Sequence, residues 1–315
     1  MGDCIDAVVV LNAALPEPFT KNIQQYFGKA GRDWLQTLPR LLAKNARQWS
    51  LILQPPFSNL SFNYVAPAVR KDGTIVVLKA GVPSNKEILT EIEALRIWDG
   101  NGCVQLLAAD VGRGMFLLEY LQPGTPLTAV SNDDQATTIA AQVMQQLWQP
   151  IDTNQLFPTV QDWFGGLTKL RQKYKGGTGP FPEKLIDKTE IVAQELLNSM
   201  ETAVLLHGDL HHDNIIKAGR QPWLAIDPKG VLGEPAYEIG ALLRNPIQRL
   251  KHTSDLKSLF TRRIDQLHEL LGFDKQRMLG WGMAQMVLGA WWANEDSDEM
   301  FPLWIHCAEL LADML

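Results

Sequence analysis

A short polar run near the middle of the chain combines the residue types that proton transfer and metal binding require. Asp209 is followed after four residues by the amide of Asn214, and an apolar run then leads to Asp227. A loop that reverses between the first two lets the carboxylate face a hydroxyl while the amide oxygen reaches a metal ion. Asp227 can supply a second, charged ligand. The spacing predicts phosphoryl transfer, with Asp209 as base and Mg²⁺ held by Asn214 and Asp227 against the phosphates of ATP.

The histidines of the same run are expected to have other roles. His207 is predicted to be structural, packing beneath the loop and bonding to backbone. His211 and His212 are adjacent and so point in different directions, and no third ligand lies at zinc spacing. The alternative for Asp209 and Asn214 is that they only cap turns. Their fixed spacing, with an aspartate downstream, favours catalysis.

Composition limits the class of protein. The chain has 315 residues and 46% apolar content, enough for one large domain or for two lobes. The net charge of −6 argues against a nucleic-acid partner and suits a cationic substrate. Three scattered cysteines predict no disulfide framework, and no apolar run suits a leader or a membrane span. We expect a cytoplasmic monomer or homodimer that acts on a small molecule and does not bind membranes.

The first part of the chain, residues 1–57, is predicted to be a helical extension packed on the lobe that follows. Helical spacing runs from Thr20 to Phe27 and from Trp34 to Leu53, and the pair Pro55-Pro56 ends the second segment. A dimer contact is the alternative use of the apolar stripe on this segment.

The next segment has the period-two pattern of strands. Ser61–Val65 and Thr74–Lys79 flank a Lys-Asp-Gly turn, and a helix is expected from Lys86 to Trp98. Lys79 resembles the strand lysine that contacts ATP phosphates in kinases. Glu91 is its preferred helical partner, with Glu87 second.

Phosphate cover and adenine recognition must come from less distinctive residues. No G-x-G-x-x-G loop lies between the first two strands, so the hairpin backbone and side chains such as Ser61 and Asn63 are expected to cover the phosphates. Two more strands, 103–108 and 115–121, lead into the Pro-Gly linker 122–126. On the kinase pattern, the Glu119 carbonyl and the Leu121 amide would bind adenine. The rest is predicted to be helical, over 133–147, 161–174, 183–201, 234–243, 255–271, 274–291 and 298–314.

Four stretches together resemble a known enzyme family. They are Glu93–Gly100, Leu118–Leu127, His207–Ile215 and Ile226–Glu238. They are similar to the aminoglycoside phosphotransferase superfamily, and in particular to the aminoglycoside/hydroxyurea antibiotic resistance kinases typified by streptomycin 6-kinases. The resemblance covers about residues 58–300.

The resemblance implies an α+β, protein-kinase-like fold with two lobes. The nucleotide-binding N-lobe, 58–121, would hold an antiparallel sheet and one main helix, and 122–126 would be a hinge. Residues 127–315 would form a mostly helical C-lobe with the catalytic loop and the acceptor site. The implied cofactors are ATP and Mg²⁺, and the implied reaction is O-phosphorylation of a small molecule. Lys79 and Glu91 would position the phosphates.

The acceptor site is expected to carry carboxylates, because aminoglycosides are polycations. One candidate is the acidic cluster with Glu295 and Asp296, expected in a loop between two late helices, which has a helix-capping role as its alternative. Glu234 and Glu238, nearer the metal aspartate, are the other. Three tryptophans could line a pocket or belong to the core: Trp281, Trp291 and Trp292.

Two other functions remain open from the sequence. One is a kinase of the same fold for another hydroxylated metabolite, such as choline, homoserine or a sugar. The other is a nucleotide-binding pseudokinase, against which the intact Lys79, Asp209, Asn214 and Asp227 argue. The choice between ATP and GTP is open as well.

Overall fold

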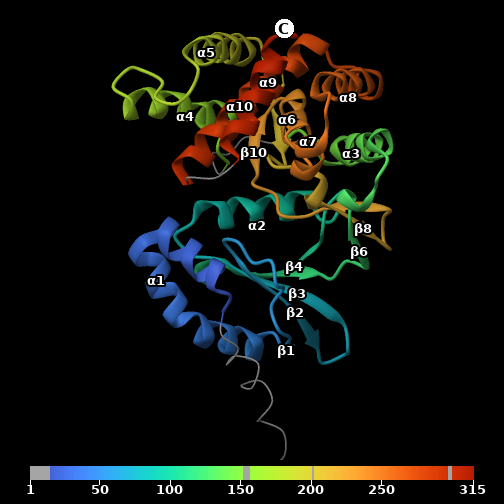
Figure 1. Ribbon diagram of the computed structural model, residues 1–315. Helices are drawn as coiled ribbons and strands as arrows, with labels where there is room; N and C mark the ends of the chain where they lie inside the picture. The colour runs from blue at the N-terminus through green and yellow to red at the C-terminus, as the bar shows by residue number, and fades with distance from the viewer. Residues whose placement is uncertain (1–14, 152–156, 201, 297–299) are drawn as a thin grey trace, which may run out of the picture. The chain divides into compact units, whose positions relative to one another are not determined.

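The chain consists of two compact units, an N-terminal unit, Met1–Leu121, and a C-terminal unit, Gln122–Leu315 (Figure 1). The computed structural model describes residues 15–151, 157–200, 202–296 and 300–315, without the side chains of 294–296. Within these ranges no helix is both long and apolar enough to cross a membrane.

The N-terminal unit is built on a five-stranded antiparallel sheet of order β1-β2-β3-β5-β4. The predicted turn between the second and third strands is present, with Gly73 in the left-handed region at φ 84° and the Thr74 amide donating to Asp72. The strands are β1 (Leu51–Leu53), β2 (Tyr64–Arg70), β3 (Ile75–Ala80), β4 (Leu106–Asp110) and β5 (Met115–Glu119).

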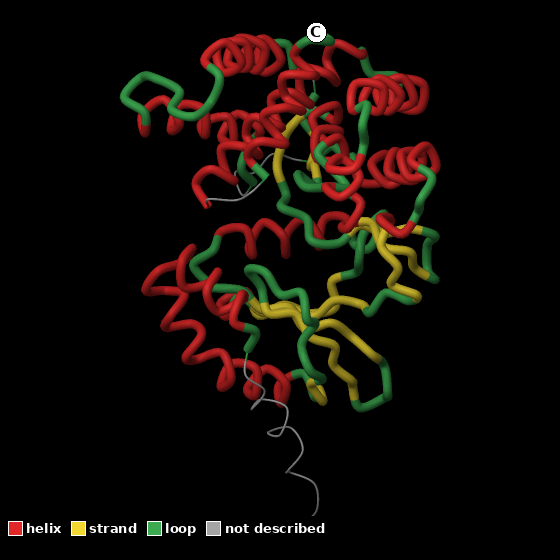
Figure 2. Tube along the Cα trace, in the orientation of Figure 1, coloured by secondary structure: helices red, strands yellow, loops and turns green. Residues whose placement is uncertain are grey.

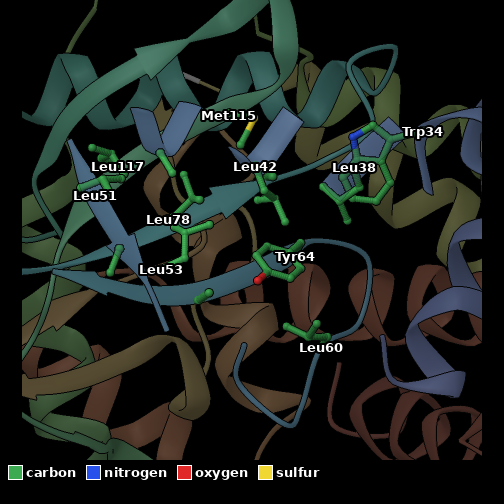
Figure 3. Packing of buried hydrophobic residues seen from close by; sticks show 14 of the residues in the cluster. Trp34, Leu38, Leu42, Leu51, Leu53, Leu60, Tyr64, Leu78, Met115 and Leu117 are labelled. Carbon is green, nitrogen blue, oxygen red and sulfur yellow. The ribbon is translucent and has the colours of Figure 1, made fainter. Parts of the chain in front are cut away.

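Helix α1 (Glu17–Gln48) covers one face of this sheet. Figure 3 shows its buried side chains Trp34, Leu38 and Leu42 among apolar side chains of the strands, including Leu78. Alternate residues of β3 point to opposite faces, so Lys79 lies on the face away from this core. Burial of alternate residues thus orients the lysine.

Helix α2 (Lys86–Trp98) forms where it was predicted. The Asn85 side chain accepts a bond from the Glu87 amide and caps its first turn. Asp99, in the left-handed conformation, ends it. The helix buries Glu91, among other residues, and leaves Glu87 exposed.

The C-terminal unit is mostly helical and is organised around α9 (Lys275–Asp296) (Figure 1). Several residues of α9, including Trp281 and Trp291, are buried, as expected for a central helix that is apolar on most faces. Close neighbours fill the space around its glycines: a Cβ on Gly282 would lie 2.7 Å from Leu243. The helices are α3 (Asp133–Leu147), α4 (Val160–Lys173), α5 (Glu183–Asn198), α6 (Ile239–Leu243), α7 (Ile247–His252), α8 (Leu256–Leu271), α9 (Lys275–Asp296) and α10 (Phe301–Ala312).

Two small antiparallel sheets hold the loops of this unit (Figure 2). One pairs β7 with β10, and the other has the order β6-β8-β9. The strands are β6 (Pro123–Pro126), β7 (Val204–Leu206), β8 (Ile215–Ala218), β9 (Trp223–Ala225) and β10 (Val231–Gly233).

Several predicted elements differ from the structure. Residues 51–53, expected to end a helix, form β1, because three apolar residues fit a helical or an extended period equally well. The two predicted N-terminal helices form one element interrupted at Gly28, whose backbone is not helical. Ser61 precedes β2, which starts only at Tyr64. The expected linker 122–126 contributes β6, which pairs with β8.

Differences in the second half concern helix ends. The predicted helix 234–243 begins with a 3-10 turn, Pro235–Glu238, and α7 was not predicted. The acidic residues 295 and 296 belong to the end of α9 and not to a loop. Residues 298 and 299, where the last helix was expected to begin, lie outside the described residues, and α10 starts at Phe301.

Candidate active site

The predicted catalytic loop, His207–Asn214, follows directly from β7 and leads into β8. Its first residue is tied to the segment after β9, because the His207 carbonyl accepts from the Lys229 amide at 2.8 Å. Gly208 has φ 83°, a conformation that strains other residues, and its Cα has no room for a side chain. The glycine of this motif is therefore required by backbone geometry.

His207 is a structural residue, as predicted. It is fully buried, and its Nε2 lies 2.9 Å from the Ile226 carbonyl, while its Nδ1 accepts from the Asp209 amide at 3.3 Å. Burial lowers the pKa of His207 to about 4, so the ring is neutral and Nε2 donates to Ile226. The ring thereby joins the base's backbone to the segment that precedes Asp227.

Glu238 also holds the backbone of the loop in place. Its two carboxylate oxygens accept from the amides of His207 at 2.7 Å and Gly208 at 2.9 Å. Burial raises the pKa of Glu238 to about 7, although these two bonds act in the opposite direction. The loop's backbone thus depends on a carboxylate that is buried in the C-terminal unit.

Asp209 presents a partly exposed carboxylate, with 28% of the side chain open. The Arg244 Nη2 donates to its Oδ1 at 3.2 Å, and His211 Nε2 lies 3.7 Å from its Oδ2. Burial acts to raise the pKa of Asp209, but His211 and Arg244 outweigh it and hold that pKa below its ordinary value. A charged carboxylate therefore stands ready to orient a hydroxyl and accept its proton.

Asn214 and Asp227 come from neighbouring strand ends. Ile215 is paired with Ala225, and the Ile226 amide donates to the Asn214 carbonyl at 2.9 Å. Asn214 donates from Nδ2 to the Asp209 carbonyl at 2.9 Å, which fixes the amide and leaves its Oδ1 without a hydrogen bond in the described part of the chain. Asp227 has a left-handed backbone, φ 62°.

An amide oxygen and a carboxylate next to the ends of two paired strands suit a Mg²⁺ ion, which prefers oxygen ligands and completes its shell with phosphate and water. No group of three or more His, Cys, Asp or Glu side chains that suits a metal ion occurs among the described residues. A site with a single carboxylate and an amide is consistent with that finding.

Lys79 and Glu91 form a buried ion pair in the N-terminal unit, with Nζ 2.7 Å from Oε1. Both side chains are almost fully buried. Lys79 also lies 5.8 Å from the ring centre of Phe116, its neighbour on β5. The choice of Glu91 over Glu87 is confirmed as far as this pair is concerned.

The other residues predicted to contact nucleotide lie in the same unit. Ser61 is exposed in the loop before β2. Glu119 ends β5, and its side chain accepts from the Gln105 amide at 2.9 Å. Leu121 is the last residue of the unit. Their contacts with a nucleotide stay predictions.

The acceptor carboxylates need correction. Glu234 is buried and accepts from Arg277 Nε at 2.7 Å and from the indole of Trp281. Glu238 binds the loop backbone, as described above. Both therefore belong to the scaffold and are not open to an acceptor. The side chains of Glu295 and Asp296 lie outside the described residues.

Arg244 is the residue that the sequence interpretation missed. It follows the apolar run of α6, and its side chain is only 10% exposed. It passes Gly289 of α9, where an added Cβ would lie 3.5 Å from its guanidinium. A single arginine directly after an apolar helix indicates a buried arginine, and such a residue needs an anionic partner. The sequence does not show which carboxylate that partner is.

Comparison with known proteins gives a consistent result. A family model described as aminoglycoside/hydroxyurea antibiotic resistance kinase matches residues 56–297. A streptomycin 6-kinase of Streptomyces glaucescens is 30% identical over 283 residues, covering 90% of this chain and 91% of that protein. A hydroxyurea phosphotransferase of Kitasatospora aureofaciens is 32% identical over 310 residues, covering 95% of this chain and 84% of that protein.

Solved structures show the same fold. An ethanolamine kinase of Plasmodium vivax has a TM-score of 0.62 at 15% identity, covering 86% of this chain and 83% of that one. Choline kinase LicA of Streptococcus pneumoniae has a TM-score of 0.60 at 13% identity, covering 88% and 99%. The predicted protein-kinase-like α+β fold is confirmed. The chain is a small-molecule kinase and belongs to the aminoglycoside/hydroxyurea antibiotic resistance kinase family.

Proposed function

We propose that this kinase transfers the γ-phosphate of ATP to a hydroxyl of a streptomycin-like aminoglycoside or of hydroxyurea. The family model and the relatives named for these two acceptors support the substrate class. The single observation that carries the chemistry is the arrangement around Asp209. An arginine holds one oxygen of this carboxylate, and an amide with a free oxygen is bonded to its backbone.

In this reaction Asp209 orients the acceptor hydroxyl and receives its proton. Because Oδ1 is bound by Arg244, Oδ2 is the oxygen that remains for the hydroxyl. Asn214 and Asp227 would hold Mg²⁺, which neutralises charge on the phosphate oxygens when bound. Lys79, oriented by Glu91, contributes a positive charge to the nucleotide phosphates. Ser61 and the backbone of Glu119 and Leu121 complete the proposed nucleotide contacts.

The test uses Asp209→Ala and Asp227→Ala with Mg²⁺-ATP and each acceptor. Asp209→Ala is expected to lose about 10²–10⁴-fold in kcat while still binding nucleotide, because it lacks only the base. Asp227→Ala is expected to lose the Mg²⁺-dependent part of nucleotide affinity, measured by calorimetry.

A matched control is Asp213→Ala, on the same loop. The Asp213 side chain is 58% exposed and accepts from Thr128 at 3.1 Å. This variant should keep its turnover. Equal turnover by the wild type and Asp209→Ala would refute the assignment of the base, and a wild type that phosphorylates neither acceptor would refute the proposed substrates.

A further inference from the structure

Two tryptophans form an open aromatic corner in the C-terminal unit. Of the three tryptophans considered from sequence, Trp281 and Trp291 are buried, whereas Trp292 of α9 is 38% exposed. A fourth, Trp163 of α4, is partly exposed. The ring centres of Trp163 and Trp292 are 6.1 Å apart, and the rings are nearly perpendicular at 89°.

This corner lies beside the catalytic loop. A Cβ added to Gly208 would come within 2.8 Å of the Trp163 ring, so the edge of that indole lies against the backbone immediately before Asp209. The same ring packs edge-on to Tyr237, with centres 6.1 Å apart. Tyr237 is buried and precedes Glu238, which holds the loop. The position of the corner relative to the base is therefore fixed by direct packing.

Trp163 is also held in place by its own helix, α4. At the start of α4, Thr159 accepts from the Asp162 amide and donates to its carboxylate, a reciprocal cap. The next residue, Phe164, is buried against Trp281 at 5.6 Å between ring centres. The cap and the buried Phe164 fix this turn of α4, and the contact with Tyr237 positions the Trp163 ring on it, as a binding surface requires.

An indole face attracts cations and stacks on flat conjugated groups. Streptomycin and hydroxyurea differ greatly in size, but each carries such a group close to a hydroxyl. In streptomycin a guanidine is attached to the carbon next to the 6-hydroxyl, and in hydroxyurea the hydroxyl is attached to a urea nitrogen. A flat guanidine or urea bound beside the loop would thus bring a hydroxyl towards the base.

We propose that Trp163 and Trp292 form an acceptor subsite that stacks the planar guanidine or urea group of the acceptor. This inference rests on the proposed function, and it specifies which part of the acceptor is recognised. A flat N–C–N group can stack on the indole faces, whereas the simple ammonium groups of other aminoglycosides can offer cation–π attraction alone.

The test compares Trp163→Leu and Trp292→Leu with the wild type. Steady-state kinetics with streptomycin and with hydroxyurea should show acceptor KM raised about tenfold or more, the size expected for a lost cation–π or stacking contact of about 1–2 kcal/mol. The KM for ATP should stay within about twofold, and Trp292→Phe should keep most of the acceptor affinity. Trp148→Leu is the control, because Trp148 packs on Phe273 at 5.5 Å, in a different aromatic pair.

A second measurement separates this inference from the proposed function. Calorimetry without nucleotide should detect binding of streptidine, the bis-guanidino ring of streptomycin, to the wild type and its loss in both leucine variants. Binding by the wild type without phosphorylation of either acceptor would refute the proposed function and leave the subsite supported. Unchanged acceptor KM in both leucine variants, or no streptidine binding by the wild type, would overturn the subsite.

Discussion

Arg244 donates from Nη2 to Oδ1 of Asp209 at 3.2 Å, and this bond leaves Oδ2 as the oxygen that the proposed base offers to an acceptor. The arginine is held by the packing of its stem against Gly289 of α9, so its position is set by a helix well away in sequence. The fold of the C-terminal unit thereby orients the carboxylate before any substrate is bound.

Replacing Arg244 should reduce the chemical step more than nucleotide binding. Arg244→Met keeps the apolar stem but removes the bond, and we expect kcat to fall about 10–100-fold with the KM for ATP within about twofold, because the carboxylate is no longer held in one orientation. Arg244→Lys should restore part of kcat. Steady-state kinetics measure both, and an ATP KM that rises as steeply as kcat falls would assign Arg244 to nucleotide binding instead.

The ion pair between Lys79 and Glu91 predicts a difference between two glutamates of one helix. Glu91→Gln weakens the charge that orients the lysine, and the KM for ATP should rise about tenfold, as expected for a charge-assisted bond of about 1.5 kcal/mol. Glu93→Gln is the matched control and should leave that KM unchanged, because Glu93 pairs with Arg96 of the same helix and not with Lys79. Equal effects of the two substitutions would contradict the pairing.

The grouping of the proposed site residues could be predicted because their spacing is local. Asp209 and Asn214 lie on one loop, and pairing of β8 with β9 brings Asp227 close to them. Lys79 was recognised by its place in a strand, and Glu91 by its place on the following helix. A sequence motif, together with the periodicity of strands and helices, is sufficient to predict partners that lie near one another in sequence.

The support for these residues could not be predicted, because it comes from distant segments. Glu238 was considered as an acceptor ligand, yet it binds loop amides 30 and 31 residues earlier. Arg244 reaches Asp209 across 35 residues. Trp163 touches Gly208 only through the packing of α4. Sequence shows that such residues are polar or aromatic, but their partners depend on helix packing.

The corrected role of Glu234 leads to a stability prediction. Its side chain is only 9% exposed and pairs with Arg277 at 2.5 Å. Glu234→Ala leaves that arginine without its anion, so the free energy of unfolding should fall by about 3 kcal/mol and the melting temperature by several degrees. The acceptor KM should not change, in contrast to a ligand of a cationic substrate.

Two further variants make this test specific. Adding Arg277→Met to Glu234→Ala should recover part of the lost stability, because no unpaired charge remains. Glu269→Ala, at an exposed position of α8, should have little effect. A normal melting temperature together with a raised acceptor KM for Glu234→Ala would return this residue to the acceptor site.

Glu238 predicts how stability and activity depend on pH. Its pKa is raised by burial from an ordinary 4.5 to about 7, so between these values the folded chain binds the proton more tightly than the unfolded chain. Its contribution to stability is therefore fully present below about pH 4.5 and is lost as the pH rises through about 7, by up to roughly 3 kcal/mol. The difference in stability between the wild type and Glu238→Gln, measured across this range, isolates that contribution from those of other groups.

The same proton should have the opposite effect on catalysis. Only the ionised carboxylate accepts strongly from the His207 and Gly208 amides, so phosphate transfer should decline as the pH falls below about 7, while the stability contribution of Glu238 grows. Glu238→Gln resembles the protonated acid in shape and charge, and its transfer rate should be low and lack this ionisation. A stability difference that does not vary with pH, or a Glu238→Gln profile with the wild-type decline, would show that Glu238 does not titrate as its burial requires.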